Sequence, residues 1–482
     1  MVCRDGSALV TITLKDKAES PESDYDRESP RPFQAQSYGS LLKFPDIPAS
    51  TLNTPSGNRD ITVPVVDAII VPTIRSAEQI SSAIELASQV RCQLVTLYTD
   101  NFPAGLSPVL SRLKRGTAIS LALRPTLRHH LLDLAADLPQ RFIPPGALDI
   151  SRKRNLGLLL GRACGWTRLL FLDDDIRRLN MGKLSSAAAL LDKYPVVGLQ
   201  VKKYPDASVV GHARRLTGRR QEPFISGGSL LVNPQRLNGF FPAIYHEDWL
   251  CIINHLRLGE VAIGGSVGQL PYGPFAVPDR ARLEEFGDIL ASGLLWLVHA
   301  DHSTIAAAQD GRGSSSAMTD HNYWRDATKT HFWEEVLNQR ATLLDNISTR
   351  LKRLNPSDLS PLLSLKAAQQ RCNELTADEF VAFTKDWIKN LAKWRDLLSL
   401  LPRVDSAEKA LAELGLSHAA STYETHSEEA LTRGTRWTGG FAGRWGRWSP
   451  TDGRHRFGLR SLRLWTGQAE QSVSHRVSRA RG

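Results

Sequence analysis

Cysteine is scarce in this chain. Only five of its 482 residues are cysteines, and they stand far apart without paired spacing: Cys3, Cys92, Cys164, Cys251 and Cys372. An odd number without pairs argues against the closed disulfide framework that stabilises small secreted domains. The cysteine content therefore favours a reducing compartment.

Long hydrophobic runs are also missing. The N-terminal sequence contains acidic residues and has no apolar run of signal-peptide length. No segment approaches the ~20 apolar residues that a membrane-spanning helix needs. We therefore expect a cytoplasmic protein without a transmembrane segment.

The composition lacks a strong overall bias. Apolar residues make up 41% and charged residues 23%, values that exclude a wholly disordered chain. The formal net charge of +10 is uneven, because residues 433–482 are rich in Arg and only Asp452 and Glu470 oppose them. Such Arg- and Gly-rich ends are usually solvated, although Arg interleaved with Trp also suits stacking on bases. Nucleic acid is thus expected as a partner of this tail at most.

Periodicity divides the chain into four segments. Residues 1–60 show no sustained pattern, and we expect a disordered arm. Residues 61–315 alternate short apolar runs with helical patterns, which is typical of an α/β domain. Residues 316–425 repeat apolar residues three and four apart and predict amphipathic helices. Residues 426–482 form the Arg-, Gly- and Trp-rich tail, which we also expect to be disordered.

The α/β segment opens with a strand, a helix and a second strand. The run "VPVVDAIIVPTIR" from Val63 is rich in β-branched residues, "SAEQISSAIELASQV" has helical spacing, and "CQLVTLYTD" ends at Asp100. This order is the signature of a parallel sheet with helical crossovers.

Three consecutive aspartates follow another predicted strand. Leu169–Leu172 is a short apolar run typical of a strand covered on both faces, and Asp173, Asp174 and Asp175 come directly after it. Ligands of open α/β sheets bind at the carboxyl ends of strands. Like charges this close repel one another, and oxygen ligands suit Mg²⁺ or Mn²⁺. The alternative is a solvated acidic turn.

The exits of the first two strands carry further candidates. Pro72 and Thr73 expose backbone groups to a flat ligand, and the guanidinium of Arg75 matches phosphate oxygens. The carboxylate of Asp100 could accept a hydrogen bond from a base or a ribose. In both places a purely structural turn is the alternative.

A basic run precedes a predicted helix in "SRKRNLG". Arg152, Lys153 and Arg154 would lie beside first-turn amides that also favour anions, so a diphosphate would find both kinds of donor there. The alternative is a basic solvated turn.

A fourth candidate combines "SGGSLLVNP" with "HEDWL". Gly227 and Gly228 would let a ligand approach the backbone closely. Glu247 and Asp248 at the start of a helix are by default acids that the helix dipole favours. Opposite a metal site, however, such a carboxylate could remove a proton from an attacking hydroxyl.

In their order and spacing, these pieces resemble a GT-A glycosyltransferase of the family 2-like group. The motifs are "VPT", "RNLG", "FLDDD", the "GG" pair and "HEDW", and the resemblance covers residues 65–305, about half the chain. It implies a Rossmann-like mixed sheet with helices on both faces, followed by the helical region.

The resemblance also implies roles for individual residues. For the nucleotide-sugar donor it implies Pro72, Thr73, Arg75, Asp100, Arg154, Asn155, Asp173 and Asp174. For an Mn²⁺ or Mg²⁺ ion it implies Asp175, with His299 or His302 completing the site if the enzyme is of the retaining kind. For the acceptor it implies Gly227, Gly228 and Trp249, and for the general base Asp248 with Glu247 beside it.

The implied activity is metal-dependent transfer of a sugar from a UDP- or GDP-activated donor to a hydroxyl. Because no lipid-embedded segment follows the predicted catalytic part, we expect a soluble acceptor rather than processive polysaccharide synthesis. A nucleotidyltransferase of related fold is one alternative, but "VPTIRSAEQ" lacks the Gly-rich loop typical of that class. A non-catalytic protein that binds nucleotide sugars or a protein partner is another.

Overall fold

The computed structural model describes the larger part of the chain. It covers residues 41–45, 65–113, 116–127, 129, 132–133, 142–202, 208–219, 225–308, 323–354 and 357–424. The predicted tail lies outside these residues, as does all of the predicted arm except residues 41–45.

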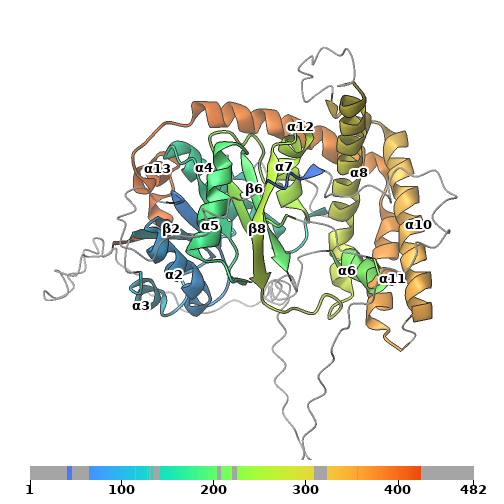
Figure 1. Ribbon diagram of the computed structural model, residues 1–482, viewed down its shortest axis with the longest axis horizontal. Helices are drawn as coiled ribbons and strands as arrows, with labels where there is room; N and C mark the ends of the chain where they lie inside the picture. The colour runs from blue at the N-terminus through green and yellow to red at the C-terminus, as the bar shows by residue number, and fades with distance from the viewer. Residues whose placement is uncertain are drawn as a thin grey trace, which may run out of the picture.

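Within the described residues, nine strands form one mixed sheet in the order β5-β8-β6-β7-β4-β1-β2-β3-β9 (Figure 1). Strands β1 to β4, β6 and β8 run in one direction, whereas β5, β7 and β9 are antiparallel to their neighbours. The strands are β1 (Ala68–Pro72), β2 (Gln93–Thr99), β3 (Thr117–Leu123), β4 (Leu169–Leu172), β5 (Ile176–Arg177), β6 (Val196–Lys202), β7 (Ser229–Val232), β8 (Val261–Gln269) and β9 (Ala420–Glu424).

Helices cover both faces of this sheet, and more helices follow beside it. Those within or before the sheet region are α2 (Ser81–Val90), α3 (Leu106–Leu110), α4 (Ala147–Ala163), α5 (Met181–Ala189), α6 (Val209–Leu216), α7 (Glu247–Arg257) and α8 (Asp279–Ala308). Those after it are α10 (Thr330–Leu354), α11 (Ser360–Glu374), α12 (Ala377–Leu400) and α13 (Ala407–Glu413).

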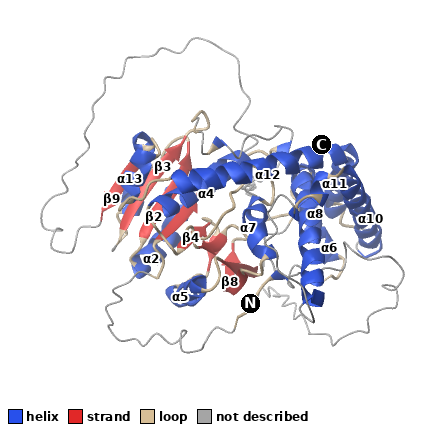
Figure 2. Ribbon diagram, turned by 90° about the horizontal axis from the view of Figure 1, so that it is seen from above, coloured by secondary structure: helices blue, strands red, loops and turns tan. Residues whose placement is uncertain are grey.

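Side chains of the central strands alternate between two hydrophobic clusters. Ile70 and Phe171 belong to the cluster that contains Leu156 of α4, and Ile69 and Leu170 belong to the cluster of α2 and α5. Both faces of each strand are therefore buried, which explains their continuous apolar sequences. Viewed from above, the strands lie between α4 on one side and α2 and α5 on the other (Figure 2). The predicted mixed α/β sheet with helices on both faces is confirmed.

The strand order reverses next to β1. This strand pairs in parallel with both β2 and β4, because the chain first runs outward through β2 and β3 and then returns to the opposite side of β1. In open α/β sheets a crevice forms at such a switch point, outside the carboxyl ends of the strands. Thr73 follows β1 and Asp173 follows β4, so the predicted site residues emerge at this crevice.

The predicted helical region is confirmed, but it is continuous with the α/β part. Helices α10 and α11 pack against α8 and α6, and α12 crosses the top of the molecule toward α4 (Figure 1). Phe286 of α8 stacks on Phe380 of α12 with ring centroids 4.8 Å apart, within a hydrophobic cluster that also contains sheet residues. The chain then ends its described course as β9, which pairs with the outer edge of β3. A strand in this region was not predicted.

Residues 41–45, which fall within the arm expected at residues 1–60, are part of the fold. Lys43 donates a backbone hydrogen bond to Val261 over 2.9 Å and accepts one from Ile263 over 2.9 Å, so it extends the sheet beside β8. Leu41 and Leu42 are buried in the core. These two leucines give the segment the apolar area that the rest of the arm lacks, and the expectation of disorder is wrong for residues 41–45.

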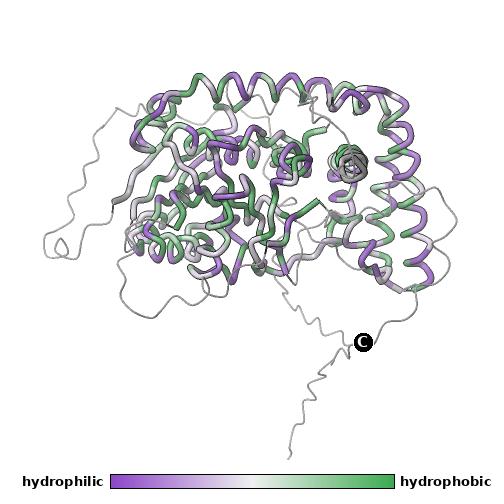
Figure 3. The backbone as a smooth tube through the Cα atoms, turned by 45° about the horizontal axis from the view of Figure 1, so that its top comes forward, coloured by the Kyte–Doolittle hydropathy of each residue, from purple (hydrophilic) through white to green (hydrophobic). Residues whose placement is uncertain are grey.

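The outer helices alternate between hydrophilic and hydrophobic residues along their length, as amphipathic surface helices do (Figure 3). Within the described residues, no helix combines the length and the apolar character that a bilayer crossing requires.

Candidate active site

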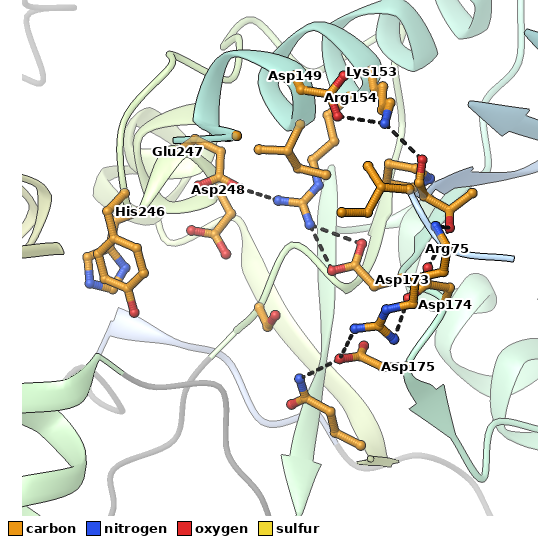
Figure 4. Close-up of a pocket in the computed structure, with 18 of the residues that line it drawn as sticks. Arg75, Asp149, Lys153, Arg154, Asp173, Asp174, Asp175, His246, Glu247 and Asp248 are labelled. Carbon is orange, nitrogen blue, oxygen red and sulfur yellow. Dashed lines mark hydrogen bonds and ion pairs between the residues drawn. The ribbon is translucent and has the colours of Figure 1, made fainter. Parts of the chain in front are cut away.

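A pocket opens at the switch point of the sheet, between the ends of β1 and β4 and the start of α7 (Figure 4). It contains residues from both halves of the α/β part. Its lining residues are Pro72, Thr73, Ile74, Arg75, Gly146, Asp149, Ile150, Lys153, Arg154, Asp173, Asp174, Asp175, Ser226, Tyr245, His246, Glu247, Asp248, Gln269, Tyr272, Arg280 and Glu284.

The exit of β1 contacts the acidic triple directly. The hydroxyl of Thr73 donates a hydrogen bond to Asp174, and Arg75 Nη1 lies 2.9 Å from Asp174 Oδ1. Arg75 Nη2 also lies 3.8 Å from Asp175 Oδ2. Two strands that are distant in sequence are thus joined at the crevice, as their parallel pairing requires.

The three aspartates have different surroundings. Asp174 is the most enclosed, and burial raises its pKa to about 6 against the lowering effects of Arg75 and Thr73. The side chains of Asp173 and Asp175 are 29% and 20% exposed and face the pocket. Gln269 of β8 donates a hydrogen bond to Asp175 Oδ2 over 3.1 Å. Asp173 and Asp175 are therefore the more accessible members of the triple.

The basic run lies inside α4 rather than before it. The helix begins at Ala147, after Gly146 in the left-handed region at φ +84°. Successive residues of a helix point about 100° apart, so the three cations diverge. Arg152 points to Asp133 and does not line the pocket, whereas Lys153 and Arg154 do. The expected cluster of three cations with first-turn amides is therefore wrong.

Lys153 is a buried cation that joins three elements. Its ammonium donates hydrogen bonds to the carbonyl of Thr73 over 2.9 Å, to the hydroxyl of Thr99 over 2.7 Å and to Asp149 over 2.6 Å. Burial lowers the pKa of this amine, and the charge of Asp149 opposes the shift. Lys153 thereby fixes the ends of β1 and β2 to α4.

Arg154 connects the acidic triple to the acids of α7. Its Nη2 lies 3.1 Å from both carboxylate oxygens of Asp173, and its Nη1 pairs with Glu247. Burial acts to lower the pKa of Arg154, but Asp173 and Glu247 outweigh it and raise the pKa. The predicted position of Arg154 in the site is therefore supported by its contacts on both sides of the pocket.

Glu247 and Asp248 begin α7, as the sequence predicts, and both line the pocket. Burial raises the pKa of the Glu247 carboxyl, and Arg154 opposes this effect. Asp248 accepts hydrogen bonds from the backbone N–H groups of Gly227 over 2.7 Å and Trp249 over 2.8 Å. Each carboxylate oxygen can accept a second bond, so Asp248 keeps the capacity to accept a proton from a ligand. Its carboxylate points toward the open centre of the pocket in Figure 4.

Gly227 and Gly228 serve neighbouring side chains rather than lining the pocket themselves. A Cβ added at Gly227 would lie 2.5 Å from Arg154 Nη1 and 3.0 Å from Asp248 Cβ. One added at Gly228 would lie 2.8 Å from Asp173 Oδ2. The two glycines leave the space in which Arg154, Asp173 and Asp248 converge. Their expected role in binding the acceptor stays a prediction.

Three other predicted residues lie away from the pocket. Asn155 donates to the carbonyl of Phe241 over 2.9 Å and accepts from its N–H over 2.8 Å, so its amide holds a loop. Trp249 is 2% exposed and packs in the core. Asp100 is exposed after β2, in the left-handed region at φ +62°, and does not line the pocket. The structure does not place these three side chains in the pocket lining.

His299, one of the two histidines proposed as metal ligands, is not at this site. His299 lies on α8, and at about 1.5 Å of rise per residue it stands roughly 28 Å along the helix from Arg280, which lines the pocket. The side chain of His302 lies outside the described residues. Among the side chains that the structure describes, no three His, Cys, Asp or Glu residues are grouped to hold a metal ion.

The pocket wall formed by Tyr272, Arg280 and Glu284 was not predicted. Tyr272 exchanges a hydrogen bond with His212 over 2.6 Å, and the Arg280 guanidinium lies 5.2 Å from the centre of the Tyr272 ring. Arg280 Nε donates to Glu284 over 2.6 Å, and Glu284 also accepts from the N–H of Val209. The spacing of Arg280 and Glu284, four residues apart on a helix, is a signal for their pairing. The spacing does not indicate, however, that helix α8 lies at the pocket.

The pocket contains more acids than strong bases. Among the residues that the structure describes, seven carboxyl groups line it, against four Arg and Lys side chains. It could therefore accept an anionic ligand at its arginines while still favouring an additional cation. No protein-family model matches this chain, and a comparison with curated proteins finds no match either.

Proposed function

We propose that the protein is a glycosyltransferase that moves a sugar from a nucleotide-diphosphate donor to a hydroxyl of an acceptor. The observation that carries this proposal is the convergence at a switch point of Arg75, Arg154, the acidic triple and the Asp248 carboxylate. Nucleotides bind at such points in other open α/β sheets, and a carboxylate across the crevice is suited to general-base catalysis.

The donor would occupy the side of the pocket formed by β1 and β4. Arg75 is 15% exposed and faces the pocket beside Asp174, so its guanidinium is within reach of phosphate oxygens. Pro72 and Thr73 line the same wall and would lie beside the nucleoside. Lys153 stabilises this wall through its hydrogen bond to the carbonyl of Thr73.

The donor set of the pocket fits Mg²⁺ or Mn²⁺ bound together with a diphosphate. These ions commonly use only one or two protein carboxylates plus phosphate oxygens, so a group of three protein ligands is not required. Asp175 would hold the ion, since it is the exposed acid whose pairing with Arg75 is long. When bound, the ion would neutralise the charge that develops on the leaving diphosphate.

The acceptor hydroxyl would approach Asp248. Its carboxylate is held by Gly227 and Trp249 and can remove the hydroxyl proton as the bond to the sugar forms. The wall with Tyr245, Tyr272 and Arg280 would then surround the rest of the acceptor, because aromatic rings with a few polar groups are typical of small-molecule sites.

Calorimetric titration tests the proposal. The chain is titrated with UDP, GDP, UDP-glucose and GDP-mannose, with and without Mn²⁺. We expect saturable binding of one nucleotide class that strengthens at least tenfold with Mn²⁺ and loses this gain in Asp175→Asn. The control is Asp192→Asn, an exposed acid that pairs with Arg168 away from the pocket. Absence of binding by all four compounds to the folded protein would contradict the proposal.

A second experiment separates the proposal from a nucleotidyltransferase. That class of enzyme would bind a nucleoside triphosphate and a sugar phosphate and release pyrophosphate. A glycosyltransferase releases the nucleoside diphosphate from the nucleotide sugar instead. Release of pyrophosphate without release of UDP or GDP would instead indicate that the protein is a nucleotidyltransferase.

A further inference from the structure

A buried chain of ion pairs connects the pocket to the helices that follow the sheet. His246 Nε2 lies 2.7 Å from Asp288 Oδ1 on α8, and Asp288 Oδ2 lies 2.9 Å from Arg340 Nη2 on α10. Arg340 also donates to both oxygens of Glu285 over 2.7 Å. Of these four side chains only His246 lines the pocket. These ion pairs therefore connect helix α10 to His246, the residue that precedes the two acids of α7.

The charges of this group balance only when His246 is protonated. Glu285 offers both oxygens to Arg340 and can match its charge alone. The second carboxylate, Asp288, then needs another cation, because an unmatched buried charge is costly. His246 is the group in contact with it. The direction of the His246 pKa agrees with this charge balance. Burial acts to lower the pKa, but the negative charges of Asp288, Asp248 and Glu247 raise it above the ordinary value.

The backbone of His246 is held in a strained conformation. Its φ of +67° and ψ of 31° lie in the left-handed region, which costs a residue with a Cβ free energy and favours Gly or Asn. Its side chain forms no cap for α7. The imidazole therefore does not serve the helix end, and it contacts Asp288 instead.

Helix α8 also packs closely against this turn. A Cβ added at Gly287 would lie 2.2 Å from the carbonyl oxygen of Tyr245. The Tyr245 and His246 rings lie 4.3 Å apart, and Ser208 at the start of α6 adds a hydrogen bond to Asp288. The turn before α7 is thus enclosed by α6 and α8, and Arg340 holds α10 to the same point.

We propose that His246 is a positioning residue: held as an imidazolium by Asp288, which Arg340 in turn fixes in place, it keeps Glu247 and Asp248 at the pocket wall. The helical region from α10 onward is then a part of the catalytic unit rather than an appended module. The inference rests on the proposed role of Asp248 for its effect on turnover. The charge state of His246 and its dependence on Asp288 are independent of that role.

Three variants and one control test the inference. His246→Asn keeps a residue suited to the left-handed turn and removes the cation. Asp288→Asn keeps the shape and leaves Arg340 paired with Glu285. Arg340→Lys keeps the charge but not the bidentate geometry. The control is His255→Asn, since His255 pairs with Glu260 over 2.8 Å at the opposite end of the same helix and does not line the pocket.

The first measurement is an NMR titration of the full chain labelled at the histidine Cε1 positions. The resonance absent from His246→Asn identifies His246. In the wild type we expect His246 to remain in the imidazolium form above the ordinary histidine pKa of 6.5. In Asp288→Asn we expect its acid dissociation constant to be at least tenfold larger. Titration at or below the ordinary histidine value in the wild type, or no change in Asp288→Asn, would overturn the inference whatever reaction the protein catalyses.

The second measurement uses UDP-glucose and GDP-mannose with Mn²⁺. We expect His246→Asn to bind the nucleotide within twofold of wild type, because His246 lies on the opposite side of the pocket from Arg75 (Figure 4). We expect it to release UDP or GDP at least tenfold more slowly. The alkaline limb of the pH profile should move to lower pH in Asp288→Asn, which removes the anion that pairs with the imidazolium. It should not move to lower pH in Arg340→Lys, which keeps the positive charge, or in His255→Asn. Wild-type turnover in a folded His246→Asn variant would refute a positioning role. If the wild type binds neither compound, the proposed function fails while the titration still decides the state of His246.

Discussion

The carboxylate of Asp248 accepts a hydrogen bond from the backbone N–H of Gly227 over 2.7 Å. The start of α7 is thereby fixed against the turn that leads into β7. The same glycine leaves room for Arg154, whose Nη1 would lie 2.5 Å from a Cβ at this position. The geometry of the proposed base therefore depends on the absence of a side chain at residue 227.

Gly227→Ala should damage the site. Overpacking a filled interior typically costs about 1–3 kcal/mol, and relief here requires movement of Arg154 or Asp248. We expect a lower free energy of unfolding by denaturant and at least tenfold slower release of UDP or GDP. The control is Gly182→Ala on α5, where the nearest atom is Asn180 Oδ1 at 3.6 Å. Because Ala is the better helix former, the control should gain a few tenths to about 1 kcal/mol. Equal effects of the two changes would contradict this explanation.

Arg154→Met should be strongly destabilising. The substitution leaves Asp173 and Glu247 without their buried partner, and breaking a buried pair from one side costs about 3–5 kcal/mol. The comparison is Arg112→Met, which removes an exposed pair with Glu78 at 2.9 Å and should cost less than about 1 kcal/mol. Chemical denaturation of both variants measures the difference, and a loss of less than 1 kcal/mol in Arg154→Met would show that the pair is not formed in solution.

Asn155→Ala separates folding from ligand binding. The variant loses both hydrogen bonds to Phe241 and leaves the Phe241 N–H without its acceptor, whereas the Phe241 carbonyl still accepts from Ser151. This loss should lower the free energy of unfolding by about 1–3 kcal/mol. The dissociation constant for the nucleotide should stay within twofold of wild type, because Asn155 does not line the pocket. Weakened nucleotide binding without loss of stability would instead restore the role that the family resemblance implies for Asn155.

Asp288 should contribute stability that disappears in acid. Burial raises its pKa, but Arg340 and His246 outweigh burial and lower the pKa from 3.8 to about 2. A depressed carboxyl pKa stabilises the folded state above the unfolded value and loses this contribution as pH falls through the folded value. The wild type should therefore lose about 2 kcal/mol between pH 5 and pH 1 that Asp288→Asn does not lose. Denaturant titrations of both proteins across this range, with Asp192→Asn as the exposed control, measure the difference.

Residues that follow strands could be predicted from the sequence, because the carboxyl ends of parallel strands meet at one edge. Thr73, Arg75 and the acidic triple lie in the pocket for this reason. Glu247 and Asp248 were found through their position at a helix start. These predictions depend on local pattern and on a general property of parallel sheets.

The remaining residues depend on packing that sequence spacing does not contain. Asn155 lies next to Arg154, but its side chain points about 100° away around α4 and meets Phe241. Arg280 and Tyr272 reach the pocket only because α8 starts beside it. Arg340 is linked to His246 through Asp288, and no periodicity indicates a contact between residues almost a hundred positions apart.

The pairing of β9 with β3 has a consequence for synthesis of the chain. Residue 117 pairs with residue 424, so the outer edge of β3 gains its partner only after nearly all of the described chain has been made. Until then the growing polypeptide presents a row of open backbone donors and acceptors, which is a template for association with other chains. Products that stop short of residue 420 are expected to aggregate even though every residue of the pocket is present in them.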